Sequence, residues 1–327
     1  MDRLGFFKHA LSGLMDAATS VVGMKQAVES MSEAVDEALS NIKSDMCLHL
    51  PSLEAKMYED PMNTLSDIAQ MGYTTLEVGA YYGDTIHDQK VDAFRDMVRK
   101  VGLKVVAVHL NREYKEEVEP STEASSAESP EAEADKAEQS AAPKSYPAEQ
   151  KWWSQAIGVA SQLGAKRIVM ARVPAFPPEQ TEQMAQTYAE YFSRIAAMAE
   201  QEGLEFCYHP SAAELRAADG RSFLDFIATN AVTERVKFQI DTFEAKQADV
   251  DIYSLLKQYQ QRIVSFHLHD RSTMCESGEI DFDAVIKYAS QCGISDIIIE
   301  VRNFTLPPMN CVERSIQNVM SLASVRL

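Results

Sequence analysis

The sequence predicts a (β/α)8 barrel, and three features of the chain carry this prediction. From Met46 onward, short β-rich runs alternate eight times with longer segments of helical period. Most of the short runs lack polar alternation, which is typical of parallel strands buried on both faces. Five glycines also fall one to three residues before a predicted strand, where a left-handed C-cap ends a helix: Gly72, Gly102, Gly164, Gly203 and Gly293.

The elements follow one another in strict alternation. The apolar runs predict strands over residues 46–50, 74–79, 103–110, 165–171, 204–209, 236–241, 262–267 and 296–300. The segments between and after them predict helices over residues 61–71, 88–101, 148–163, 178–202, 221–229, 250–259, 281–292 and 310–324. A strand followed by a helix eight times over gives a parallel sheet that closes on itself. We therefore expect one barrel domain over residues 45–327.

Two segments lie outside this repeat. In residues 1–44, apolar side chains recur in steps of three and four from Met24 to Ile42, which predicts an amphipathic helical extension. This helix either packs against the closed bottom of the barrel or pairs with another subunit in a homo-oligomer. Residues 113–147 are rich in Glu, Ala, Ser and Pro, and they predict a disordered acidic insertion after the third strand. That position is the catalytic face of such a barrel.

Composition excludes several classes of function. The formal net charge of -18 opposes binding to a nucleic acid backbone. No apolar run approaches the length that a bilayer span needs, so we expect no membrane partner. Lys8, His9 and Asp16 interrupt the apolar segment that a signal peptide would require. We therefore expect a cytoplasmic globular protein.

Polar side chains stand at the carboxyl ends of the predicted strands, where a barrel brings them into one pocket. They are Glu77, His109, His209, Asp241, His267, His269 and Glu300, and Glu214 follows the fifth strand closely. Asp241, His267 and Glu300 end three consecutive runs. Carboxylate and imidazole side chains in this arrangement are typical of a divalent metal site that serves a small polar substrate.

Several ordered motifs resemble a known family. They are GYTTLEVGAYYGD, GLKVVAVHLN, KWWSQAIGVASQLGAKRIVM, FQIDTF, FHLHD, GEIDFDAVIKYASQCG and IIIEVRN. From about Asp45 to the end, without the acidic insertion, the chain resembles the xylose isomerase-like TIM barrels. This family contains sugar phosphate isomerases and epimerases, together with AP endonucleases of the endonuclease IV type.

The resemblance implies a divalent ion, Mn, Zn, Mg or Co, held by Glu214, Asp241, His267 and Glu300, and a small carbohydrate substrate. The chain departs from the family pattern at two positions. The family's His-Asn-His segment before the Glu reads HPS here, so Ser211 replaces the second His. His269 stands where the family has Lys.

Such a site would perform sugar isomerisation or epimerisation through an enediolate. Glu214 and Glu300 would move the proton from opposite sides, with His209 assisting. The remaining polar groups would bind hydroxyls or the oxyanion, or orient another group: Glu77, His109, His269 and Arg302. Two alternatives stay open, namely a keto-glycoside lyase or hydratase on the same site and a non-catalytic sugar-binding barrel. Repair of abasic DNA is disfavoured, because the chain lacks the additional His and Asp ligands of a multi-zinc cluster.

Overall fold

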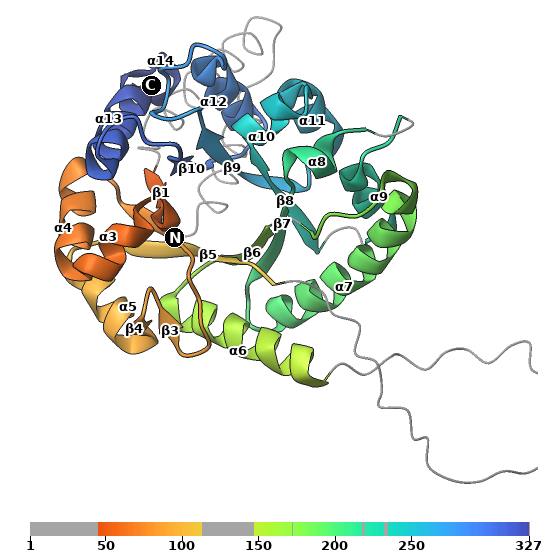
Figure 1. The fold of residues 1–327 in the computed structure, drawn as a ribbon, viewed down its shortest axis with the longest axis horizontal. Coiled ribbons are helices and arrows are strands. Elements are labelled where there is room, and N and C mark those ends of the chain that lie inside the picture. The colour runs from red at the N-terminus through yellow and green to blue at the C-terminus, as the bar shows by residue number, and fades with distance from the viewer. Residues whose placement is uncertain (1–44, 113–146, 172, 218–219, 232–234, 327) are drawn as a thin grey trace, which may run out of the picture.

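Eight parallel strands form a closed barrel (Figure 1). The computed structural model describes residues 45–112, 147–171, 173–217, 220–231 and 235–326. The strands are β1 (Cys47–His49), β2 (Thr75–Val78), β5 (Lys104–Leu110), β6 (Arg167–Ala171), β7 (Glu205–His209), β8 (Val236–Asp241), β9 (Ile263–His269) and β10 (Asp296–Glu300). Strand β1 closes the barrel because it pairs with both β2 and β10. The predicted fold class is confirmed, whereas the predicted extension and residues 113–146 of the predicted acidic insertion lie outside the described residues.

Helices surround the barrel in the order that the sequence predicts (Figure 1). The predicted helices are present as α4 (Pro61–Met71), α5 (Val91–Lys100), α6 (Pro147–Leu163), α7 (Thr181–Gln201), α9 (Phe223–Asn230), α11 (Ile252–Tyr259), α12 (Phe282–Gln291) and α13 (Pro308–Ser321). Shorter elements were not predicted as separate units: η1 (Leu50–Leu53), α3 (Glu54–Glu59), β3 (Thr85–Ile86), β4 (Gln89–Lys90), η2 (Pro178–Gln180), α8 (Ala212–Leu215), α10 (Thr242–Gln247) and α14 (Ala323–Arg326). Within the described ranges, every helix is too short or too polar to traverse a lipid bilayer.

The glycine C-caps predicted from the sequence are confirmed. All five of these glycines have positive φ, from 72° at Gly203 to 105° at Gly72. At Gly72 the left-handed backbone ends α4 three residues before β2 begins. This allows the chain to reverse sharply from each helix into the next strand.

Side chains alternate along each strand between the layer that faces the helices and the interior of the barrel. On β7, Phe206 and Tyr208 point outward and pack against Phe192 of α7, with ring centroids 5.4 and 4.8 Å apart. Cys207, one position along, belongs instead to a small apolar cluster with Ala107 and Val169. Because side chains alternate along a strand, Cys207 and His209 both face the barrel axis. The main core therefore lies between the sheet and the helices, and the barrel interior changes from apolar to polar toward the strand carboxyl ends.

An ion pair lies at the amino-terminal ends of the strands. Arg167 begins β6 and is 5% exposed. Its Nη2 lies 2.7 Å from Asp296 Oδ2 at the start of β10, and 3.3 Å from Glu205 Oε2 at the start of β7. Because β6 and β10 are not neighbours in the barrel, this contact joins distant strands at the end opposite the candidate site.

Candidate active site

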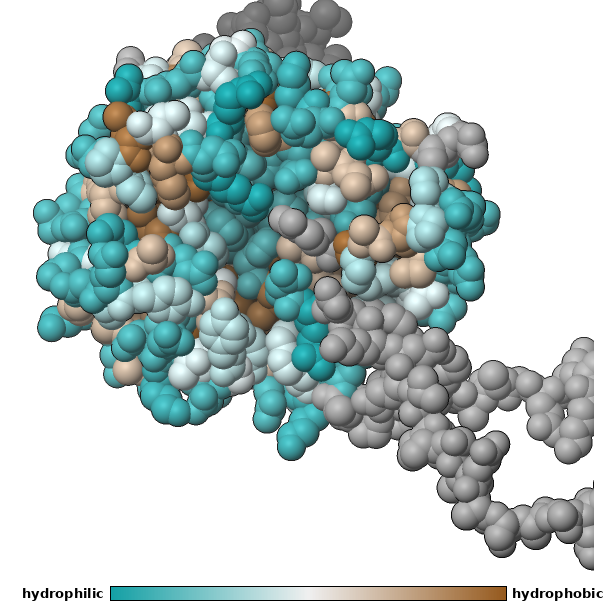
Figure 2. Space-filling model, in the orientation of Figure 1, coloured by the Kyte–Doolittle hydropathy of each residue, from teal (hydrophilic) through white to brown (hydrophobic). Residues whose placement is uncertain are grey.

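The strand carboxyl ends bring the predicted side chains into one polar cluster. Its members are His49, Glu77, His109, His209, Asp241, His267, His269 and Glu300, and all except the half-buried His109 are buried. Figure 2 shows a hollow in the middle of the face that the helices surround, walled mostly by hydrophilic residues. The clustering follows from the parallel register, in which Asp241 pairs with His267 and Glu300 pairs with His269.

His267 lies at the centre of this cluster, between two carboxylates. Its Nδ1 is 2.6 Å from Glu300 Oε2 and its Nε2 is 2.7 Å from Glu77 Oε1. Burial alone would lower the pKa of His267, but the charge of Glu77 and the hydrogen bond with Glu300 outweigh it and raise the pKa to about 10. Without a bound cation, His267 is therefore an imidazolium that donates a proton to each carboxylate.

Glu77 holds His267 in this orientation through a buried network. Burial would raise the pKa of the Glu77 carboxyl, but the His267 charge and the hydrogen bonds from His267 and His49 hold it well below its usual range. His49 Nδ1 lies 2.8 Å from Glu77 Oε1, and Gln239 Nε2 donates to Glu77 Oε2 at 2.8 Å. Gln239 Nε2 also lies 3.1 Å from Ser265 Oγ. The ionised Glu77 thus fixes several side chains at once.

The sequence reasoning missed Gln239 and Ser265, and it left His49 out of the site. The missed signal is the period of two along a strand. Gln239 precedes Asp241 by two positions, and Ser265 precedes His267 by two, so each pair faces the same side of the sheet. A polar residue two positions before a polar strand end therefore marks a deeper layer of the same site.

Asp241 serves two neighbours with its two oxygens. Oδ1 accepts hydrogen bonds from the backbone N–H groups of Phe243 and Glu244, at 2.7 and 2.8 Å, and so caps α10. Oδ2 lies 2.9 Å from His269 Nδ1. Burial would raise the pKa of Asp241, but the hydrogen bond and charge of His269 lower it. The carboxylate is ionised and held rigidly beside His267.

Glu300 is the third buried carboxylate, and it has a cationic neighbour. Arg302 Nε forms an ion pair with Glu300 Oε1, and the Arg302 side chain is 40% exposed. Burial would raise the pKa of Glu300, but nearby His49, His267 and Arg302 hold it well below its usual range. Arg302 therefore links the buried site to the surface.

Asp241, His267 and Glu300 lie close enough together to hold a cation. Each offers one ligand atom, and these atoms lie within 4.8 Å of one another. Two carboxylates and one imidazole suit Mn²⁺, Zn²⁺, Co²⁺ or Mg²⁺. Each of the three side chains is no more than 1% exposed. The residues present therefore fit the divalent ion that the sequence predicts.

Glu214 is not part of this group in the described structure. Its Oε1 accepts a hydrogen bond from Val173 N at 2.8 Å, and its Oε2 accepts from Ser211 N at 2.9 Å and from the Tyr208 hydroxyl. Glu214 and Ser211 form the capping box of the short helix α8. Burial raises the pKa of Glu214, although the Tyr208 hydrogen bond opposes this.

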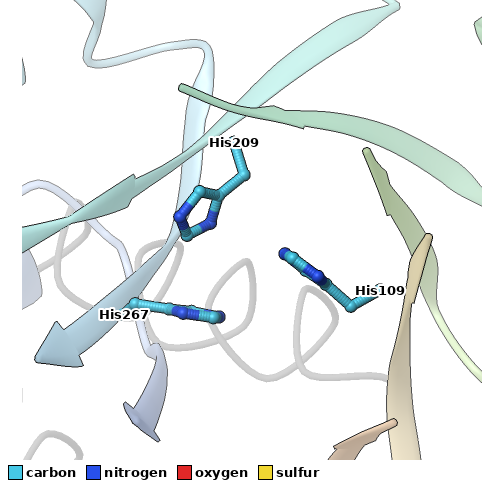
Figure 3. Close-up of side chains that lie close together, drawn as sticks. All are labelled: His109, His209 and His267. Atoms are coloured by element: carbon cyan, nitrogen blue, oxygen red, sulfur yellow. The ribbon is translucent and has the colours of Figure 1, made fainter. Parts of the chain in front are cut away.

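His109 and His209 face His267 from β5 and β7 (Figure 3). His209 Nδ1 lies 2.8 Å from Gln239 Oε1, and His109 Nε2 is buried with no hydrogen-bond partner. Burial and the charge of His267 lower the pKa of His209 to about 4, and burial lowers the pKa of His109 well below its usual range. Both rings are neutral near pH 7.

The fold is similar to several solved structures. One is a sugar phosphate isomerase/epimerase from Parabacteroides distasonis ATCC 8503, with a TM-score of 0.70 and 21% identity over 86% of this chain and 94% of that chain. Another is the IOLI protein with a zinc atom, with a TM-score of 0.60 and 13% identity over 86% and 99% of the two chains. A third is 3-keto-D-glucoside 4-epimerase from E. coli, with a TM-score of 0.58 and 13% identity over 80% and 95%.

At these identities the likeness shows the fold alone. No curated protein sequence matches the chain. The family model described as xylose isomerase-like TIM barrel matches residues 65–319, which is most of the chain and includes every strand from β2 to β10. The resemblance found in the sequence is thereby confirmed, and the chain belongs to the xylose isomerase-like TIM barrel family.

Proposed function

We propose that this protein is a divalent-metal-dependent isomerase or epimerase that acts on a sugar or a sugar derivative. The observation that carries the proposal is the convergence of Asp241, His267 and Glu300 from three consecutive strands, with ligand atoms within 4.8 Å of one another. The similar solved structures include a sugar phosphate isomerase/epimerase and a 3-keto-D-glucoside 4-epimerase, which supports the same substrate class. The zinc in the IOLI structure supports a bound cation.

In this proposal, Asp241, His267 and Glu300 hold the cation, and Glu77 orients the His267 ring from behind. When bound, the cation would act as a Lewis acid that makes a C–H bond next to a carbonyl more acidic. Carboxylates that position a ligating histidine are commonly needed for metal affinity. The short Glu77 contacts to His267 and His49 fit that role.

Two carboxyl groups would transfer the proton. Glu300 is ionised and can accept a proton from the substrate carbon, giving an enediolate. Glu214 has a raised pKa, which suits a group that holds a proton and returns it. Return from the opposite side gives the epimer, whereas return at the adjacent carbon gives the isomer. Glu214 would serve as the fourth cation ligand only by exchanging one of its present hydrogen bonds.

Four other side chains would bind the substrate. The neutral rings of His109 and His209 can donate to or accept from sugar hydroxyls. Arg302 is half exposed and carries a fixed positive charge beside Glu300, so it suits a developing oxyanion. His269, which replaces the family's Lys, is held by Asp241 and would contact the substrate through its unpartnered Nε2.

One observation favours a second candidate, a sugar-binding barrel without catalysis. Both oxygens of Glu214 are already used by Val173, Ser211 and Tyr208, so this carboxylate serves the local structure in the absence of substrate. If that arrangement persists when sugar binds, only one proton-transfer group remains. A keto-glycoside lyase or hydratase would use the same site, but the enolate would expel a β-substituent instead of taking a proton back at carbon.

The test is solvent deuterium incorporation into keto-sugars and 3-keto-glycosides, with and without added Mn²⁺. We expect exchange at one carbon in the wild type and its loss in Asp241→Asn. The amide of this variant can still accept the α10 capping bonds but offers a poor cation ligand.

Asp251→Asn is the matched control, because Asp251 also caps a helix, α11, at an exposed position. It should retain exchange. Sugar binding without any exchange, in protein with bound metal, would reject catalysis and favour the binding barrel. Loss of a β-substituent would identify the lyase.

A further inference from the structure

We propose that His109, His209 and His267 form a second cation position in the barrel mouth. It overlaps the position formed by Asp241, His267 and Glu300, because both use His267. The first position is rich in carboxylate oxygen, whereas the second consists of three imidazole nitrogens. The chemistry of the ion would therefore decide which position it occupies.

Three strands that are separated in the barrel order aim these rings at one space (Figure 3). Ring centroids lie 5.3 Å apart for His109 and His209, 4.7 Å for His209 and His267, and 5.8 Å for His109 and His267. One nitrogen from each ring lies within 4.8 Å of the others. Small rotations of the side chains would bring these atoms to metal–nitrogen distances of about 2.1 Å.

His209 has a free lone pair because its tautomer is fixed. Gln239 Nε2 donates to the Glu77 carboxylate, which can only accept. The Gln239 amide oxygen must therefore face His209 Nδ1, 2.8 Å away. An amide oxygen accepts, so Nδ1 carries the proton and Nε2 keeps its lone pair. A backing hydrogen bond of this kind is the usual support of a ligating histidine.

His109 supplies the second, independent observation. Its Nε2 is buried and has no hydrogen-bond partner among the described residues. A buried nitrogen without a partner is costly, so such atoms commonly have a ligand, an ion or a water as partner. The neighbouring rings of His49, His209 and His267 surround His109. A cation that accepts nitrogen ligands would provide the missing partner.

Ligand preference separates the two positions. Imidazole suits Zn²⁺, Ni²⁺ and Cu²⁺, whereas carboxylate oxygen suits Mg²⁺ and Mn²⁺. His267 belongs to both groups, and a neutral imidazole offers one lone pair. The two cations therefore cannot bind at the same time, unless the ring loses both N–H protons and bridges them. We expect one ion per chain. Mn²⁺ would bind at Asp241, His267 and Glu300, whereas Zn²⁺, which both sets of ligands can hold, would prefer the three histidines because they offer more nitrogen.

The experiment measures the affinity of chelator-treated full-length protein for Zn²⁺ alone and for Mn²⁺ alone, by titration calorimetry. His109→Gln and His209→Gln should each weaken Zn²⁺ binding by about 10-fold or more and leave Mn²⁺ binding nearly unchanged. Asp241→Asn should show the opposite pattern. His87→Gln is the control, since His87 is another buried histidine with unpartnered nitrogens, outside the cluster.

Equal effects of the histidine substitutions on both ions, or no effect on Zn²⁺, would overturn the proposal. If a variant fails to fold, the wild type still provides a test, because Mn²⁺ at saturation should reduce apparent Zn²⁺ affinity by direct competition for His267. Independent binding of both ions would contradict the shared ring. The Mn²⁺ result alone tests the proposed function, so wild-type protein that binds Zn²⁺ but not Mn²⁺ would reject that function without rejecting the second position.

Discussion

Replacing Glu77 by Gln should weaken both the folded state and cation binding. Glu77 is fully buried and accepts hydrogen bonds from His267, His49 and Gln239 at 2.7 to 2.8 Å. Gln keeps the volume but removes the charge and presents an N–H group to one of these donors. Breaking one side of a buried ionic contact costs about 3–5 kcal/mol. We therefore expect the free energy of unfolding of metal-free protein to fall by about this amount.

The same substitution leaves His267 without the carboxylate that orients it. Loss of such a supporting group typically reduces metal affinity by about 10–100-fold. Urea unfolding of the metal-free protein and Mn²⁺ titration of the folded protein measure the two effects. Glu59→Gln is the control, because the Glu59 side chain is 62% exposed and its ion pair with Lys56 is at the surface. A Glu77→Gln variant within about 1 kcal/mol of wild type, with unchanged Mn²⁺ affinity, would refute the role assigned to Glu77.

Three further predictions concern positions outside the cluster. Burial lowers the pKa of His87 to about 4 from 6.5, so its contribution to stability is present above pH 6.5 and is lost as pH falls toward 4. In wild type, the free energy of unfolding should therefore fall by about 3 kcal/mol from this group between pH 6.5 and pH 4, and in His87→Gln this part of the fall should be absent. Urea unfolding of both proteins at several pH values in this range measures the difference. Arg167→Met should cost about 3 kcal/mol, because Asp296 loses its closer and buried partner at the bottom of the barrel and keeps only the more distant Lys166. It should leave Mn²⁺ affinity unchanged in the same titration. Gly72→Ala should cost about 1–2 kcal/mol in thermal unfolding, because φ is 105° there while the nearest atom to the added carbon, 3.7 Å away, leaves room.

The strands and the residues at their ends could be predicted because both are local properties of the sequence. An apolar run that ends in a polar residue is visible in VKFQID and RIVSFH, and parallel topology brings those ends together. Strand β9 runs to His269 rather than ending at His267, because His269 still pairs with Glu300. That extension depends on a neighbouring strand far away in sequence, so the run alone could not indicate it.

The hydrogen bonds of the site could not be predicted, because they depend on register between strands. Asp241 was expected as a ligand, yet its Oδ1 also begins α10, a helix too short to show a hydrophobic period. Glu214 remains a predicted cation ligand, but in the described structure it forms the capping box of α8 with Ser211, the serine that stands where the resemblance places a His. Ser211 therefore draws Glu214, the predicted ligand, into the hydrogen bonds that begin a short helix, and neither residue shows this by itself in the sequence.

The charges of the site also bear on the substrate. Glu77, Asp241 and Glu300 are buried and ionised, and His267 and Arg302 are the cationic groups beside them. The carboxylates would therefore largely neutralise a divalent cation, and little positive charge would remain to bind a phosphate dianion. In addition, the net charge of -18 repels anions at long range. We expect uncharged keto-sugars to exchange deuterium faster than their phosphate esters at equal concentration. The reverse order would refute this argument from the charges of the site.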